Sequence, residues 1–321
     1  VIGKRLGYRI VVYAEWEARW YGWVDRFGVM NAATVNKIPQ PYTYKATIVG
    51  DLMTEVAAMV PDAAPTSARS PTIGLLPGSK AHKLKLGVPF MLAMVSYIRR
   101  SLPNVRFVLP VAPTVTCDEI AQFARADHNS CIRQFGWAEG ELARNHDRLV
   151  LRTHTDSGTI DIELYEDFPA YHVLAQCDAC VTTVGANTAE LGALAVPMVV
   201  VIPTQQMDVM KTWDGLPGII ANLPLVGSGF ATLFNWYMGY RLGVFGSSKR
   251  RTLFAWPNIW AGEEIVPELV GRLQPVDVAN RLIDWLTHPE ALQQVRDRLR
   301  SVRGDTGAAS KLVAIVVELL P

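Results

Sequence analysis

The chain has 321 residues, of which 50% are hydrophobic and 19% are charged. This composition suffices for a large apolar core in two domains of ordinary size, and it excludes global disorder. Thirty-one basic residues against thirty acidic ones give a net charge of +1, which excludes a dedicated nucleic-acid binder with a strongly basic surface.

Residues 1–55 alternate short strands and helices and form the first predicted domain. We expect a buried strand at 9–14, an aromatic and charged stretch to Trp23, and another strand at 47–50. The pattern reads like the middle of an α/β domain, and residue 1 is Val rather than Met. The sequence therefore predicts a first domain whose front is missing.

Residues 56–71 are rich in Pro, Ala and Ser and form a predicted linker to a second domain at 72–275. Short apolar strands there alternate with helices, which predicts βαβ units and a parallel sheet. The expected strands are 72–76, 106–110, 149–153, 179–183 and 197–202, and the expected helices are 84–100, one from about 118, 171–176 and 185–194. Apolar stripes in residues 276–321 predict two terminal helices.

Two strand-to-helix turns of the second domain suit an anion. The first contains Gly78, Ser79 and Lys80, which offer close backbone approach, a hydroxyl and a positive charge. In the second, a strand ends at Gly185, and Asn187, Thr188 and Glu190 follow at the start of a helix. The amide and hydroxyl can donate to phosphates, and the Glu190 carboxylate can accept from ribose hydroxyls. The residues alone therefore predict a phosphate-bearing ligand at the carboxyl ends of the strands.

Cys177 and Cys180 form a C-x-x-C, a spacing that occurs in zinc and redox sites. No second close pair supplies further ligands, and the apolar run at 179–184 favours a helix end running into a buried strand. His82 and His154 lie near predicted strand ends, where a surface or capping role is favoured over contact with a ligand.

Several motifs together resemble the lipid A disaccharide synthase family. The run Leu75-Leu76-Pro77-Gly78-Ser79-Lys80 is similar to that family's L-L-P-G-S-R, and residues 185–190 with 197–200 are similar to its S-G-T-A-x-L-E and P-M-V-V segments. Residues 257–269 resemble its P-N-x-x-A-G-R-E-x-V-x-E-L signature, and 49–53 resemble its interdomain V-G-H segment. The likeness runs in order over nearly the whole chain from about Gly7.

The resemblance implies an α/β fold of the GT-B type, in which two Rossmann-like domains face a cleft and the second holds UDP. It implies no metal or other cofactor. Carried over by position, the donor site comprises Gly78, Ser79, Lys80, Gly185, Asn187, Thr188, Glu190, Asn258 and Glu264. A ribose-binding role for Glu190 is also implied by similarity to the peptidoglycan N-acetylglucosaminyltransferase. Three positions depart from the family: Lys80 and Glu263 each replace an Arg, and Asp51 replaces a His.

The resemblance places the family's catalytic Asp in the front of the first domain, which we expect this chain to lack. Glu15, at the end of a first-domain strand, is the candidate for acceptor-side or catalytic work. The competing interpretation is a polar group among packing tryptophans.

Residues 215–240 carry no charge but contain two prolines and several glycines, so a continuous spanning helix is not expected. They belong to an apolar insertion at about 203–256, which either docks on an anionic membrane surface or forms a buried hairpin over the donor site. We favour docking through aromatic and basic side chains, namely Phe230, Phe234, Trp236, Tyr237, Lys249, Arg250 and Arg251. This predicts a cytoplasmic protein at the inner face of the membrane.

The sequence thus predicts an inverting glycosyltransferase that moves a sugar from a UDP-sugar to a lipid-linked acceptor, in the manner of lipid A biosynthesis. One alternative is a UDP-sugar epimerase on the same fold. Another is a non-catalytic descendant that binds a nucleotide sugar or lipid. A homo-oligomer stays possible.

Overall fold

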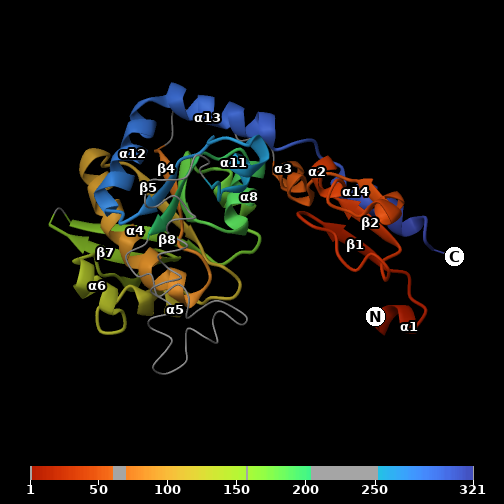
Figure 1. Ribbon diagram of the computed structural model, residues 1–321. Helices are drawn as coiled ribbons and strands as arrows, with labels where there is room; N and C mark the ends of the chain where they lie inside the picture. The colour runs from red at the N-terminus through yellow and green to blue at the C-terminus, as the bar shows by residue number, and fades with distance from the viewer. Residues whose placement is uncertain (1, 61–69, 157, 204–251, 321) are drawn as a thin grey trace, which may run out of the picture.

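The computed structural model describes residues 2–60, 70–156, 158–203 and 252–320. Two separate sheets organise these residues, one with eight strands and one with three (Figure 1). The predicted membrane-docking residues between 230 and 251 lie outside the described part of the chain.

The larger sheet has the strand order β11-β10-β9-β4-β5-β8-β7-β6. In chain order its strands are β4 (Thr72–Leu76), β5 (Arg106–Pro110), β6 (Glu141–Asn145), β7 (Arg148–Thr155), β8 (Gly158–Tyr165), β9 (Ala179–Thr183), β10 (Met198–Pro203) and β11 (Glu268–Gly271). The predicted strands at 72–76, 106–110 and 179–183 are confirmed at both ends.

The sequence predicted a parallel sheet, but the larger sheet is only partly parallel. Strands β11, β10, β9, β4, β5 and β8 pair in parallel, whereas β7 is antiparallel to both β8 and β6. The connection from β6 to β7 is tight: only His146 and Asp147 separate the two strands, and His146 has a φ of 53°. A two-residue connection allows a hairpin, which needs no crossover helix.

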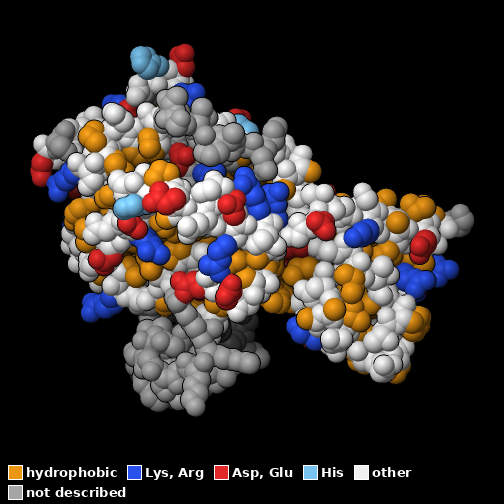
Figure 2. All heavy atoms as spheres, turned by 90° about the horizontal axis from the view of Figure 1, so that it is seen from above, with side chains coloured by type: hydrophobic (Ala, Val, Ile, Leu, Met, Phe, Trp, Pro, Cys, Tyr) orange, Lys and Arg blue, Asp and Glu red, His pale blue; other side chains and the backbone are white. Residues whose placement is uncertain are grey.

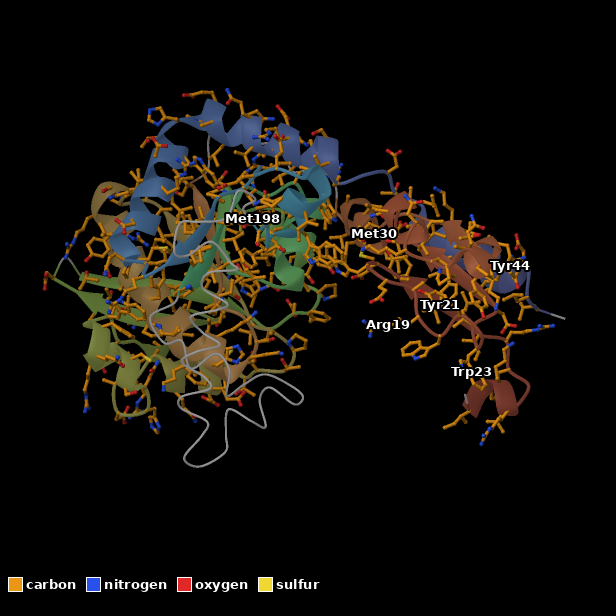
Figure 3. All side chains as sticks on the ribbon, viewed as in Figure 1. Arg19, Tyr21, Trp23, Met30, Tyr44 and Met198 are labelled. Atoms are coloured by element: carbon orange, nitrogen blue, oxygen red, sulfur yellow. The ribbon has the colours of Figure 1, made fainter. Side chains whose placement is uncertain are left out.

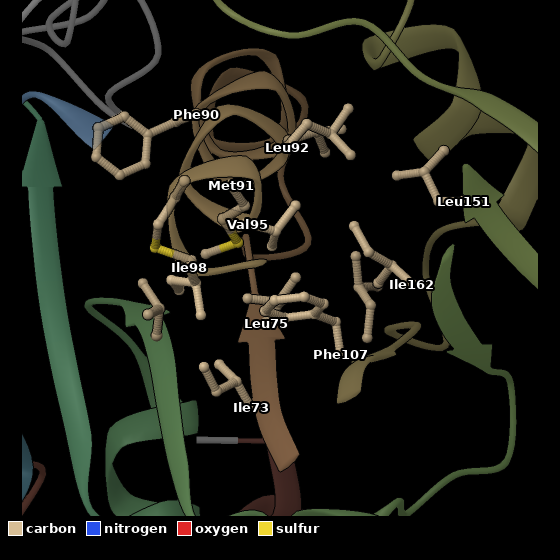
Figure 4. Close-up of a cluster of buried hydrophobic side chains, with 14 of the residues drawn as sticks. Ile73, Leu75, Phe90, Met91, Leu92, Val95, Ile98, Phe107, Leu151 and Ile162 are labelled. Carbon is tan, nitrogen blue, oxygen red and sulfur yellow. The ribbon is translucent and has the colours of Figure 1, made fainter. Parts of the chain in front are cut away.

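Helices cover both faces of the larger sheet. Side chains of β4 alternate, so Ile73 and Leu75 pack beneath Met91 and Ile98 of α4 (Figure 4), while Leu76 enters the core on the opposite face. The helices of this unit are α4 (Ala81–Ser101), α5 (Cys117–Phe123), α6 (Ser130–Phe135), α7 (Tyr171–Leu174), α8 (Ala186–Ala193), α11 (Trp256–Ala261), α12 (Pro275–Thr287) and α13 (Pro289–Val302). The result is a three-layer unit whose central strands are buried on both sides.

The smaller sheet has the order β1-β2-β3 and is parallel throughout. It consists of β1 (Val11–Ala14), β2 (Arg26–Val29) and β3 (Ala46–Ile48), with helices α1 (Ile2–Arg5) and α2 (Ala32–Val35) and the 3₁₀ turn η1 (Gln40–Lys45). Hydrophobic side chains are frequent on the surface of this unit (Figure 2). Trp23 and Tyr44, labelled in Figure 3, are among those exposed, whereas Met198 lies inside the larger unit.

The C-terminal part contains three helices rather than the expected two. Pro289 begins α13 directly after α12 ends, and α14 (Ala308–Val317) follows after Gly304 and Gly307. α14 returns to the smaller sheet and packs on β1 and β2, where a Cβ atom added at Gly28 would lie 2.6 Å from Cδ1 of Leu312.

The two connections between the units meet at one carboxylate. The first contains the 3₁₀ turn η2 (Leu52–Glu55) and α3 (Val56–Met59), so the start of the predicted linker is helical. Glu55 at the end of η2 accepts hydrogen bonds from the backbone N–H groups of Gly307 (2.8 Å) and Ala309 (3.1 Å) at the start of α14. Glu55 thereby joins the outgoing and returning chain segments.

Replacing a buried side chain of α14 should unfold the smaller unit more readily than replacing an exposed one. Ile315 is 4% exposed and Val313 is 59% exposed. Ile315→Ala should lower the free energy of unfolding by about 2–4 kcal/mol, and Val313→Ala by less than about 0.5 kcal/mol. Urea unfolding followed by tryptophan fluorescence measures both values. Equal effects would mean that α14 does not complete the core of this unit.

Candidate functional site

A cavity of about 330 Å³ lies beyond the carboxyl ends of the central strands of the larger sheet. It is lined by the turn after β4, residues 110–114 after β5, residues around Tyr171, and the turn after β9. β4 pairs with β5 on one side and with β9 on the other, so the strand order reverses here. Ligands of open α/β sheets bind at such switch points, and the volume is within the range of small-molecule sites.

Two glycine turns bring backbone close to the cavity. Gly78 has a φ of +97°, and a Cβ atom there would lie 2.8 Å from Cδ of Lys83. Gly185 has a φ of +156° and a ψ of −164°, a combination found almost only at glycine. Neither position accommodates a side chain without strain at the backbone.

Two helices begin at this cavity, and neither has a side-chain cap. The N-cap of α4 is Lys80 and that of α8 is Gly185, and neither makes a side-chain hydrogen bond to its helix. The first N–H groups of a helix have no partner within the helix, and the helix dipole adds partial positive charge there. Two such termini beside one cavity form a site suited to an anion.

The remaining wall of the cavity carries polar side chains. Ser79, Asn187 and Glu190 line it, and none of the three makes a side-chain hydrogen bond to another described residue. Burial raises the pKa of the Glu190 carboxyl above its ordinary value. Burial, followed by the charge of Glu190, raises the pKa of the Tyr171 hydroxyl. The half-buried carboxylate is thus available for donors on a ligand.

The cavity brings together five of the nine predicted donor residues, Gly78, Ser79, Gly185, Asn187 and Glu190. Lys80 is exposed at the N-cap of α4 and does not line it. Thr188 is fully buried; its hydroxyl donates to the Gly185 carbonyl (2.9 Å) and accepts from the Trp256 N–H (3.2 Å). Thr188 therefore holds α8 to α11 instead of facing the cavity.

Asn258 is not a cavity residue either, because it is fully buried in α11. Its amide donates to the Val266 carbonyl and to Oε1 of Glu268, both at 2.8 Å, and accepts from the N–H groups of Ile265 (2.7 Å) and Val266 (2.9 Å). Glu264 is exposed, and its carboxylate accepts from the Glu268 N–H at 3.4 Å. These two polar residues organise the segment between α11 and β11.

The sequence did not predict four polar residues of the cavity, Lys83, Thr114, Tyr171 and Thr183. For Lys83 the available signal was its spacing: it lies three residues after Lys80, in the first turn of a helix, where residues three apart are neighbours. Tyr171 and Thr183 carry no sequence signal for ligand binding, because a tyrosine or a threonine at a strand end more often packs against the protein than contacts a ligand.

Glu15 lies just beyond β1 in the smaller unit and is exposed. Its partial burial and the nearby Asp51 raise the pKa of its carboxyl. The neighbouring Trp16 ring contacts that of Trp256 in the larger unit, with centroids 4.8 Å apart. Asp51 caps η2 by accepting from the Met53 N–H at 2.8 Å. Glu15 does not line the cavity, but the Trp16 contact attaches its loop to the larger unit.

Cys177 and Cys180 are fully buried, Cys177 after α7 and Cys180 in β9, as the helix-to-strand interpretation expects. Across residues 2–60, 70–156, 158–203 and 252–320, no three His, Cys, Asp or Glu side chains are grouped to hold a metal ion. His82 is exposed beside Lys83, and His154 contacts Glu141 at 3.3 Å. None of the described helices is both long and apolar enough to cross a membrane.

The sequence is similar to curated lipid-A-disaccharide synthases. It is 24% identical to the Geobacter sulfurreducens protein over 252 residues, which are 77% of this chain and 49% of the relative. It is also 24% identical to the Myxococcus xanthus protein over 260 residues, 79% of this chain and 51% of that one. The chain spans about half the length of the curated relatives it matches. No protein-family model matches it.

Among solved structures, the fold is similar to the S. aureus MnaA-UDP co-structure, with a TM-score of 0.48 and 11% identity over 94% of this chain and 61% of that one. It is also similar to the wall teichoic acid polymerase TagF, with a TM-score of 0.40 and 14% identity over 93% of this chain and 58% of that one. Likenesses at this level assign no function.

The two asparagines of this region should differ in their effect on stability. Asn258→Ala would leave the buried N–H groups of Ile265 and Val266 without their acceptor and would remove a donor to Oε1 of Glu268, and should lower the free energy of unfolding by about 2–4 kcal/mol. Asn187→Ala, on the cavity wall, should change it by less than about 0.5 kcal/mol. Chemical denaturation measures both. Similar values for the two variants would contradict the structural role of Asn258.

Glu190 should reduce the stability of the unliganded protein at neutral pH. Folding raises its pKa, so ionisation of the folded carboxyl costs free energy once the pH passes the ordinary glutamate pKa of about 4.3. Glu190→Gln should therefore raise the melting temperature at pH 7 and leave it unchanged at pH 4. The exposed Glu290→Gln should not raise it at either pH. A Glu190→Gln protein no more stable than wild type at pH 7 would refute this.

Proposed function

We propose that this distant homologue of the lipid-A-disaccharide synthases is the nucleotide-sugar-binding part of a two-domain GT-B glycosyltransferase. In this proposal the cavity holds a UDP-sugar, and the sugar passes with inversion to a lipid-linked acceptor. The proposal rests on one observation above the others, the meeting of two uncapped helix N-termini and a half-buried carboxylate in a single cavity at the switch point.

The geometry suits the two ends of a nucleoside diphosphate. A pyrophosphate at the starts of α4 and α8 would receive hydrogen bonds from backbone N–H groups that have no partner within either helix. Glu190, one turn into α8, would accept from the ribose hydroxyls, and those donors would offset the cost of its burial. The same N–H groups would stabilise the negative charge that develops on the leaving UDP.

Transfer with inversion needs one displacement. The acceptor oxygen forms a bond to the anomeric carbon, the bond from that carbon to the pyrophosphate oxygen breaks, and a base takes the acceptor proton. We propose Glu15 for the acceptor side, because burial and Asp51 raise the pKa of its carboxyl and make it a stronger base than an ordinary glutamate. The Trp16–Trp256 contact would bring its loop toward the donor-binding unit.

A lipid-linked acceptor and peripheral binding to the cytoplasmic membrane face belong to the same proposal. Apolar side chains are exposed on the smaller unit, among them Trp20 and Tyr44, at 67% and 71%. Aromatic residues of this kind suit the interface between lipid and water. The aromatic and basic residues between 230 and 251 are proposed to contribute to the same attachment.

Calorimetric titration with UDP, UDP-GlcNAc and UDP-glucose tests the donor site. Wild type should bind at least UDP, and Glu190→Gln should weaken binding about tenfold or more through loss of charged hydrogen bonds to ribose. Glu290→Gln, far from the cavity on α13, is the matched control and should bind like wild type. Failure of a well-folded wild type to bind any of the three would overturn the proposal.

Product analysis with the preferred donor then separates the functions. Sugar appearing on a lipid acceptor supports transfer. Conversion of the donor without acceptor would indicate an epimerase, and binding without turnover would indicate a non-catalytic protein.

A further inference from the structure

We propose that Lys83 is the phosphate-binding cation of the cavity, in the role that the sequence assigned to Lys80. The ligand class is a diphosphate whose two phosphates each meet one of the two helix N-termini, with the Lys83 ammonium between them. This inference deepens the proposed function and rests on it for the nucleotide part of the ligand.

The side chain of Lys83 links the two glycine turns. Its aliphatic stem passes Gly78, where an added Cβ atom would lie 2.8 Å from Cδ and 3.1 Å from Cβ of Lys83. Its Nζ ends beside Gly185, 3.6 Å from the position of a Cβ atom there, and donates to the Val184 carbonyl at 2.6 Å. The absence of side chains at 78 and 185 thus leaves room for the lysine to reach the start of α8.

The ammonium group retains capacity for a ligand. It has three N–H donors, and the Val184 carbonyl takes one of them. No described carboxylate lies within ion-pair distance of Nζ, so its charge is not neutralised within the described part of the protein. Burial and the nearby charge of Lys80 lower the pKa of Lys83, and a bound phosphate would reverse that effect by supplying negative charge.

A second polar group, the Thr183 hydroxyl, supports the binding of a ligand beside Lys83. Thr183, at the end of β9, is 8% exposed, and its hydroxyl has no hydrogen-bond partner among the described residues. Thr183 lines the cavity, and its hydroxyl oxygen lies 3.1 Å from where a Cβ atom of Gly78 would lie. A buried hydroxyl without a partner is costly, and a hydrogen bond to a bound ligand would remove that cost.

Lys80 has none of these features. It is exposed at the N-cap of α4, and its side chain does not reach the cavity wall. Because the two lysines carry the same charge one turn apart, they form a matched pair for substitution.

The test compares Lys83→Met with Lys80→Met, each titrated with UDP, uridine and inorganic pyrophosphate. Met keeps most of the aliphatic stem, so melting temperatures without ligand should stay close to wild type. Lys83→Met should weaken binding of UDP and of pyrophosphate by about tenfold or more, as expected for loss of charge-assisted hydrogen bonds, and leave uridine binding unchanged. Lys80→Met should change any of these affinities by less than about threefold, as expected for an exposed charge.

The outcomes separate this inference from the nucleotide proposal. Equal losses in the two variants, or unchanged binding by Lys83→Met, overturn the role of Lys83 while leaving UDP binding intact. A third outcome is that pyrophosphate binding depends on Lys83 but UDP binds no more strongly than pyrophosphate. That result supports the role of Lys83 and overturns the proposal that the cavity binds a nucleotide. Wild-type protein that binds neither pyrophosphate nor UDP overturns both.

Discussion

Strands β4 and β9 pair in parallel at the centre of the larger sheet, although more than one hundred residues separate them along the chain. Parallel pairing places the carboxyl ends of both strands at one edge, so the turns that follow them and the helices that begin after them meet there. Cores on both faces of the sheet hold this pair in register. Every feature of the cavity, from the glycine turns to the position of Lys83, depends on that register.

The sequence predicted those secondary-structure elements that depend on the pattern of neighbouring residues alone. Continuous apolar runs between turn residues located β4, β5 and β9, because a doubly covered parallel strand must be apolar on both faces. The alternating pattern of β7 and β8 gives a weaker signal, and the hairpin that they form was not predicted. Which polar residues face the cavity depends on how distant segments meet. Asn258 is an example, since only the packed structure brings the backbone at 265–266 and the Glu268 carboxylate to its amide.

The cavity is also a place where the polar groups are incompletely satisfied. The Thr183 hydroxyl has no described partner, burial raises the pKa of Glu190, and burial lowers that of Lys83. Other polar groups of the same unit are paired within the protein, for example Arg152 with Asp161 and the capping box of α5. Polar groups without partners are common in an empty binding site, because the ligand supplies the missing partners.

The return of α14 to the smaller sheet has a consequence for the order in which the protein folds. β2 ends at Val29, yet the helix that packs on β1 and β2 begins at Ala308, so more than 250 residues are synthesised between them. The smaller sheet must therefore wait, without the helix that covers it, while the residues of the larger unit are synthesised. The smaller unit is then completed only after the larger one has been synthesised, and its uncovered sheet is where a chaperone would be needed.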